Sequence, residues 1–160
     1  MRVVIIDNEI ECQKKLKDLL SRCDTSNIEV IGCENSLTSG IKTITTTNPD
    51  LVFFNINSGN KYGLEMMTKI KPLNFQIVLI SAHDKYAIKA IKFGAIDYLL
   101  KPLSIEELKT ALKKTQERLN LIFNAEQIKN PINNYDISPY FKQKLPISLV
   151  DRTIFIEKSN

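Results

Sequence analysis

The sequence has no apolar stretch close to the ~20 residues that a membrane-spanning helix needs. Its N-terminus also lacks the features of a signal peptide. The apolar run from Met1 to Ile6 leads directly into Asp7, Asn8 and Glu9, without a longer apolar region or a small-residue cleavage site. These two absences predict a cytoplasmic protein that has no membrane among its partners.

Cysteine and histidine are scarce, and neither is spaced for a metal site. The three cysteines, Cys12, Cys23 and Cys33, are an odd number with no CxxC or Cys/His pattern, which argues against a disulfide framework or a zinc site. We expect reduced, half-buried thiols, with Cys12 a packing residue. His83 is the single histidine. With no nucleophile and orienting acid beside it, it is expected to be a surface residue and not a general base.

Charge of one sign is not concentrated in any segment. The net charge of +4 is modest and the lysines are scattered, which favours a solvated basic face over a nucleic-acid-binding run. The length of 160 residues allows one ordinary domain with a small appendage.

Five short apolar runs recur along the chain, and the stretch between each pair is long enough for a helix. The runs are residues 2–6, 28–32, 51–54, 76–80 and 96–100. Apolar runs without polar alternation are typical of strands buried on both faces of a parallel sheet. Their alternation with helical stretches predicts an α/β fold with a five-stranded, parallel, doubly wound sheet.

Five helices are predicted to flank this sheet. Apolar residues at helical spacing mark the first four: Leu16, Leu19 and Leu20; Leu37, Ile41 and Ile44; Leu64, Met67 and Ile70; and Tyr86, Ala87, Ala90 and Ile91, with Phe93 as a further candidate. Gly94 is expected to end the fourth helix in a left-handed conformation. Ser104 and Glu107 are expected to form a capping box before the fifth.

The fifth helix carries a heptad-like stripe: Ile105, Leu108, Leu112, Thr115, Leu119 and Ile122. A sheet can cover only ~15 residues of a helix at its 1.5 Å rise, so the residues from Leu119 to Phe123 would protrude. Two explanations stay open. The extension could pair with a second subunit, or the helix could end sooner and these residues fold back on the same domain.

Polar residues follow the strands at the edge where doubly wound sheets carry their function. Asp7-Asn8-Glu9 follows the first strand, Asn55 the third, Ser81 the fourth and Lys101-Pro102 the fifth. A carboxylate, an amide, a hydroxyl and an ammonium that converge on one cleft form a pocket suited to an anionic group.

With these residues in place, the sequence resembles the receiver domain of two-component response regulators over residues 1–124. The motifs VVIIDNE, PDLVFFN, ISA and DYLLKP occur in the order and spacing of that family. The segment SAHDKYAIKAIKFGAIDYLLKP is similar to receivers that precede a LytTR DNA-binding domain. The resemblance implies a flavodoxin-like sheet and a role in signal transduction and transcription regulation, not enzymatic catalysis. A related hydrolase would use an aspartate such as Asp7, but no second aspartate follows two residues later.

The resemblance also implies a role for each pocket residue. The acidic or metal-binding positions are Asp7, Asn8 and Asn57, the phosphate-accepting position is Asn55, the switch residues are Ser81 and Tyr98, and the family's lysine and cis-proline are Lys101 and Pro102. Ser58-Gly59 stands where most relatives have a Met-Pro-like pair.

Carboxylates are thus missing from two of the three positions that the family uses for Mg²⁺ and phosphate. An amide nitrogen is a poor nucleophile, so we expect a degenerate, or pseudo-, receiver that is not phosphorylated at Asn55. No cofactor is expected. Mg²⁺ would bind only if the site is still competent, with at most a weak site at Asp7. Lys101 would instead pair with Asp7.

Two functional hypotheses follow from this comparison. The first is an interaction module that forms a homodimer through its fourth helix, fifth strand and fifth helix, and that meets a sensor histidine kinase or another regulator. The alternative is a conventional phosphoreceiver in a phosphorelay, in which Asn55 is an engineered or compensated substitution.

The rest of the chain is predicted to be a linker, residues 125–143, and a β-hairpin, residues 144–160. Pro131, Pro139 and several asparagines mark the linker. Runs 146–150 and 153–157 flank the predicted turn of the hairpin. The segment LPISLVDRTIFIEKSN resembles the first strands of a LytTR domain. It includes no element that reads bases, so we expect no specific DNA binding by this chain and DNA binding by a longer regulator to which it would belong.

Overall fold

The computed structural model of the chain describes residues 1–23, 28–56, 74–129, 144–149 and 152–157. The chain divides into two compact units, Met1–Asn120 and Leu121–Asn160. The positions predicted to hold the third helix, together with Asn57 and Ser58-Gly59, lie outside the described residues.

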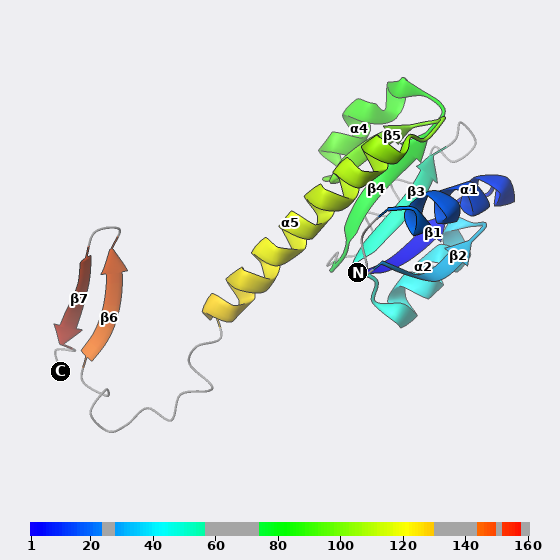
Figure 1. Ribbon diagram of the computed structural model, residues 1–160. Coiled ribbons are helices and arrows are strands. Elements are labelled where there is room, and N and C mark those ends of the chain that lie inside the picture. Colours follow the sequence, from blue (N-terminus) through cyan, green and yellow to red (C-terminus); the bar gives the residue numbers. More distant parts are fainter. Residues whose placement is uncertain (24–27, 57–73, 130–143, 150–151, 158–160) are drawn as a thin grey trace. The chain divides into compact units, whose positions relative to one another are not determined.

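The first unit is built on one sheet of five parallel strands (Figure 1). The strands are β1 (Arg2–Ile6), β2 (Glu29–Glu34), β3 (Leu51–Ile56), β4 (Gln76–Ser81) and β5 (Asp97–Leu100). Their order in the sheet is β2-β1-β3-β4-β5, and every neighbouring pair is parallel. The predicted doubly wound sheet is therefore confirmed. The chain changes direction across the sheet between β1 and β3, which is where such folds place a functional cleft.

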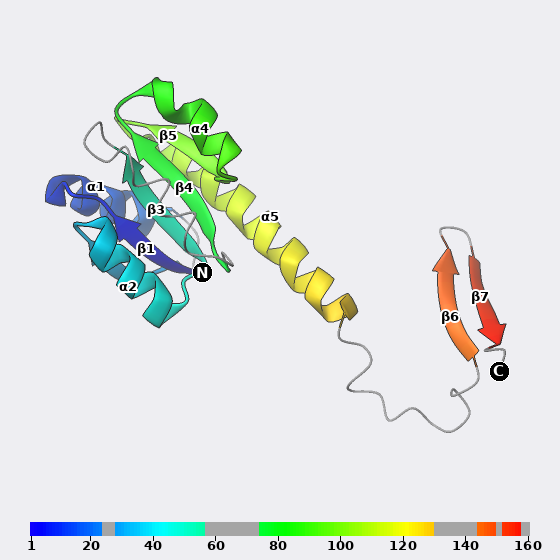
Figure 2. The same cartoon turned by 180° about the vertical axis from the view of Figure 1, so that it is seen from behind.

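Helices cover both faces of this sheet, as the two opposite views show (Figures 1 and 2). The helices α1 (Ile10–Ser21) and α5 (Ile105–Lys129) contribute to the core on one face. The helices α2 (Leu37–Thr47) and α4 (Ala87–Lys92) contribute to the core on the other, and a short 3-10 turn, η1 (Asp84–Tyr86), precedes α4.

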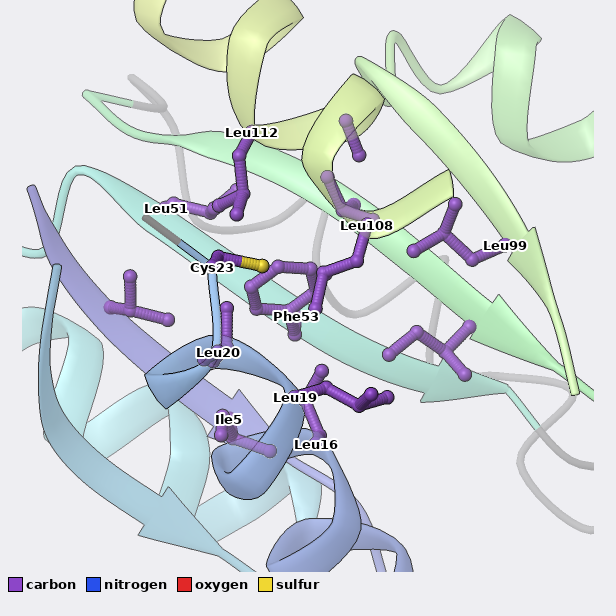
Figure 3. Packing of buried hydrophobic residues seen from close by; sticks show 14 residues of the cluster. Ile5, Leu16, Leu19, Leu20, Cys23, Leu51, Phe53, Leu99, Leu108 and Leu112 are labelled. Carbon is purple, nitrogen blue, oxygen red and sulfur yellow. The ribbon is translucent and has the colours of Figure 1, made fainter. Parts of the chain in front are cut away.

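Figure 3 shows the core under α1 and α5, with Phe53 of β3 among leucines from both helices. Leu16 of α1 and Leu108 of α5 are buried with it. Burial of each such side chain contributes roughly 1.5–3 kcal/mol. The stripe predicted for the first helix, Leu16, Leu19 and Leu20, is confirmed, and through these residues α1 packs on the core of this face.

The prediction for the fourth helix is wrong at Ile91, whose side chain is 74% exposed. Ala90 is buried, and Tyr86 and Phe93 pack against the core on either side of it. The helix has only six residues. The two aromatic anchors and the small alanine fix its rotation and turn Ile88 and Ile91 to the surface.

Gly94 ends α4 as predicted, with a φ of 77°. Its N–H donates to the carbonyl of Ile91, and the N–H of Ala95 donates to the carbonyl of Ala90. These two bonds form a Schellman motif, which favours glycine at the left-handed position.

The fifth helix begins at the predicted cap and is longer than the sheet. The Ser104 hydroxyl accepts from the backbone N–H of Glu107 and contacts its carboxylate. Leu108, Leu112 and Thr115 of the predicted stripe are buried. The helix continues to Lys129, so the explanation in which it ends sooner is wrong.

The second unit holds the rest of α5 and an antiparallel hairpin of β6 (Lys144–Leu149) and β7 (Arg152–Glu157). In the hairpin Lys144 is opposite Glu157 and Leu149 is opposite Arg152. At the start of this unit Leu121 and Phe123 are 62% and 59% exposed, in agreement with the prediction that they protrude.

Candidate functional site

Asp7 is the centre of the site at the carboxyl end of β1. It is 5% exposed and is the only buried charged side chain in the described part of the chain. One carboxylate oxygen, Oδ1, accepts from the side-chain amide of Asn55 at 2.7 Å and from the backbone N–H of Glu9 at 2.9 Å. The other, Oδ2, accepts from Lys101 Nζ at 3.3 Å. Every strong acceptor of this buried carboxylate therefore has a protein donor.

Asn55 lies within β3, directly beside β1, and its side chain is buried. Its Nδ2 is the donor to Asp7. A carboxylate at position 55 would face Asp7 as a like charge, which disfavours ionisation of both. The amide N–H instead donates a hydrogen bond to Asp7. Position 55 is thus a donor to the pocket's carboxylate.

Lys101 supplies the positive charge of the site from the end of β5. Its Nζ lies 3.3 Å from Asp7 and 3.5 Å from Glu9, and it donates to Cys12 Sγ at 3.2 Å. Burial alone would lower the pKa of Lys101. The hydrogen bond to Cys12 and the charge of Asp7 outweigh that effect and raise the pKa above its ordinary value. The predicted pair of Asp7 and Lys101 is present.

Cys12 is a site residue that the sequence reasoning missed, and Glu9 was placed at this edge of the sheet but given no role. Cys12 Sγ donates to Glu9 Oε2 at 3.0 Å. This bond, with the charge of Lys101, lowers the pKa of the Glu9 carboxyl. Burial, followed by the bond to Glu9, raises the pKa of the Cys12 thiol. The interpretation of Cys12 as a packing residue was incomplete. The i, i+3 spacing of Glu9 and Cys12 at the start of a helix was the available signal.

Ser81 and Tyr98 are joined through the peptide groups of one residue, His83. The Ser81 hydroxyl is fully buried, donates to the carbonyl of Ile56 at 2.8 Å and accepts from the N–H of His83 at 3.2 Å. The Tyr98 hydroxyl donates to the carbonyl of His83. The side chain of His83 is exposed, as predicted. Its backbone therefore ties the end of β4 to the middle of β5.

The family model for the response regulator receiver domain matches residues 3–113. The chain belongs to this family. An uncharacterized response regulatory protein of Vibrio vulnificus is 36% identical to this chain. The alignment covers 71% of this chain and 47% of the Vibrio protein. The sensory transduction protein LytT of Bacillus cereus is 29% identical over an alignment that covers 92% of this chain and 59% of LytT. The chain spans about half the length of the first of these relatives.

Solved structures share the fold of this receiver. A response regulator receiver domain from Clostridium thermocellum superimposes with a TM-score of 0.62 and 26% identity, covering 76% of this chain and 98% of that one. Among the described helices, none combines the length and the apolar character needed to cross a membrane. The match over residues 3–113 makes this part of the chain a response-regulator receiver domain of two-component signalling.

Receivers with a competent site bind Mg²⁺, so the oxygen ligands of this site decide whether it suits that ion. Mg²⁺ takes oxygen ligands, in most sites from one or two carboxylates with several waters. Asp7 is the one buried carboxylate among the residues that the structure describes, and its two oxygens already accept from Asn55, Glu9 and Lys101. Asn8 is exposed. No group of three acidic, histidine or cysteine side chains that could hold a metal exists among residues that the structure describes. These residues do not fit Mg²⁺.

The remaining predicted site residue is Pro102, and its peptide bond with Lys101 is cis, as the resemblance implied.

Proposed function

We propose that this receiver signals through protein contacts and not through phosphorylation of residue 55. The observation that carries the proposal is the buried hydrogen bond from Asn55 Nδ2 to Asp7 Oδ1 at 2.7 Å. Phosphate transfer to a receiver needs a carboxylate oxygen that attacks phosphorus. Here the amide at that position offers no anionic oxygen, and its nitrogen donates to Asp7.

The internal ion pair supports the same proposal. Lys101 lies between the carboxylates of Asp7 and Glu9, so Asp7 has a counter-charge from the protein itself. A receiver of this kind needs no cofactor.

The signal would act on the Ser81 and Tyr98 pair. Both hydroxyls are hydrogen-bonded to the backbone of His83, between β4 and η1. A partner that binds another conformation of this segment more tightly would shift the equilibrium toward that conformation. In the competing interpretation Ser81 and Tyr98 serve only packing. It predicts that the Tyr98 side chain keeps its position and its hydrogen bond when a partner binds.

The surface best suited to a partner lies on α4 and β5. We propose that the chain forms a homodimer whose interface consists of α4, β5 and α5. Ile88 and Ile91 are 70% and 74% exposed, and Leu100 of β5 is 42% exposed. Exposed apolar side chains that gather on neighbouring elements are typical of interaction surfaces.

Sedimentation velocity of the full chain tests the dimer. The wild type is expected to dimerise, and the double variant Ile88→Lys/Ile91→Lys is expected to be a monomer. Ile10→Lys, at a 60% exposed position of α1, is the matched control and should dimerise normally. A wild type that sediments as a monomer at high concentration excludes the dimer.

The resemblance of the last segment to the first strands of a LytTR domain supports a role in transcription regulation for a longer protein. We infer that such a protein is cytoplasmic, binds DNA through further sequence, and receives its input from a sensor histidine kinase or another regulator. This receiver would supply the regulatory contact and no enzymatic activity.

Intact-mass measurement with acetyl phosphate and Mg²⁺ tests the central proposal. The wild type should gain no phosphoryl group, and a single phosphoryl adduct on it would refute the proposal. Asn35→Asp, an exposed position after β2, is the control for a new aspartate and should also remain unmodified.

The variants Asn55→Asp and Asn8→Asp/Asn55→Asp separate the two hypotheses. If both substitutions are needed before an adduct forms, the loss of metal and phosphate chemistry is concerted and the proposal stands. If Asn55→Asp alone is phosphorylated readily, the rest of the site is competent, and the alternative of a phosphoreceiver with a compensated or engineered Asn55 is favoured.

A further inference from the structure

A pocket of about 330 Å³ lies beside the Asp7 carboxylate, between α1 and the turn after β5. Most of its lining is apolar and comes from Leu16, Ile80, Pro102 and Leu103. An apolar cavity of ~150 Å³ accepts benzene, and pockets for small ligands begin at roughly 300 Å³. The volume is therefore enough for a body of about two rings.

The polar groups of the pocket indicate the charge of its ligand. Asp7 and Lys101 line it and already satisfy each other. Lys15 also lines it and has no ion-pair partner within the part of the chain that the structure describes. Because Lys101 is shared by the carboxylates of Asp7 and Glu9, an anion in the pocket would take its counter-charge from Lys15, and a second negative charge on it would approach Asp7. The pocket thus suits one negative charge.

We propose that this pocket binds a small organic monoanion with an apolar body, whose anionic group meets Lys15 and whose body packs on Leu16, Ile80 and Leu103. Cys12, Lys15 and Leu16 share one face of α1 by their i, i+3 and i+4 spacing, so a single helix presents the cation, the apolar wall and a thiol. This binding would be a chemical input to the receiver that goes beyond the proposed function and does not depend on the state of Asn55.

The Cys12 thiol lines the pocket and reports its occupancy. The probe is 1-naphthaleneacetate, and 1-naphthaleneacetamide is its neutral counterpart with the same ring body. Alkylation by N-ethylmaleimide is followed by peptide mapping of the full chain. Cys33, also half-buried, is the reference in the same sample. At ten times its dissociation constant the anion should slow alkylation of Cys12 about tenfold by mass action and leave Cys33 unchanged.

Two lysine variants of α1 test the charge. Lys15→Met should weaken naphthaleneacetate binding about twofold to fivefold, as expected for an exposed charge pair, and leave the amide unchanged. Lys17→Met, which is exposed and does not line the pocket, should bind both probes as the wild type does. Backbone amide shifts at Cys12 and Leu103 provide a second measurement that needs no thiol reactivity.

Three results would overturn the proposal. One is naphthaleneacetate that neither slows Cys12 alkylation nor shifts the amides of Cys12 and Leu103. Another is equal slowing at Cys33, which would indicate nonspecific association. The third is a Lys15→Met variant with wild-type affinity for the anion. The acetyl phosphate measurement is unaffected by any of these, so this proposal and the proposed function fail independently.

Discussion

Removal of the charges of Asp7 and Lys101, singly and together, should reveal a favourable coupling between them. The four chains are the wild type, Asp7→Asn, Lys101→Met and the double variant. Lys101→Met leaves a buried carboxylate that keeps its bonds from Asn55 and Glu9 but loses its counter-charge. The double variant removes both charges, and it should therefore be more stable than the sum of the single losses predicts.

The structure sets the magnitude of this coupling. Oδ2 of Asp7 and Nζ of Lys101 are 3.3 Å apart, with side chains 6% and 19% exposed. Coulomb's law gives an attraction of about 5 kcal/mol at an effective dielectric constant of about 20. Desolvation and the other partners of both groups reduce the net value, so we expect a coupling free energy of about 2 kcal/mol.

The pair of Glu11 and Lys14 on α1 is a matched control. Its atoms are closer, at 2.8 Å, but its side chains are 83% and 67% exposed. Exposed pairs on a helix contribute about 0.3 kcal/mol. Urea unfolding followed by far-UV circular dichroism measures both cycles, and equal m-values ensure that the same surface is exposed on unfolding. A coupling at Asp7 and Lys101 no larger than that of the control pair would refute the reasoning.

Three further predictions concern pH, the switch residue and a helix end. The raised pKa values of Cys12 and Lys101 mean that the unfolded chain releases these protons first, so stability should fall as the pH rises above 9.0 and further above 10.5, their ordinary values. In urea titrations the difference in free energy of unfolding between the wild type and Lys101→Met should decrease over that pH range. A difference that stays constant would contradict the raised pKa of Lys101. Ser81→Ala should destabilise the receiver by about 1–3 kcal/mol in the same titration, because it leaves the carbonyl of Ile56 buried without its donor; a loss near zero would mean that water replaces the hydroxyl. Gly94→Ala should lower the free energy of unfolding by about 1–2 kcal/mol because of its φ of 77°, and a neutral result would mean that the turn adopts another conformation.

The fold could be predicted because its signal is repeated along the sequence. Runs such as 51–54 are apolar on both sides and are bounded by polar residues, which identifies buried parallel strands without any tertiary information. The rotation of α4 could not be predicted in this way. Ile88 and Ile91 are as apolar as the residues that face the core, and only the packing of Tyr86 and Phe93 decides which side is buried.

The contact between Asp7 and Lys101 could be predicted because the two side chains carry opposite charges at the strand ends. The contact between Lys101 and Cys12 could not be predicted, because it depends on the packing of α1. With Asn at positions 8 and 55, Asp7 was the obvious counter-ion for Lys101, and the pair is present. The second pairing, of Lys101 with Glu9, was not predicted. The contact of Lys101 with Cys12 joins residues 89 positions apart. It depends on how α1 lies against the turn after β5, and nothing in the local spacing of either segment encodes that distance.

The use of backbone atoms at His83 has a consequence for how this receiver can vary. Because both hydroxyls bond to its peptide groups, nineteen of the twenty amino acids could supply the same contacts, and only proline, which has no N–H, removes one of them. Position 83 can therefore be central to the loop while its residue type drifts freely. A survey of amino-acid identity would pass over it, and a scan of proline substitutions would find it.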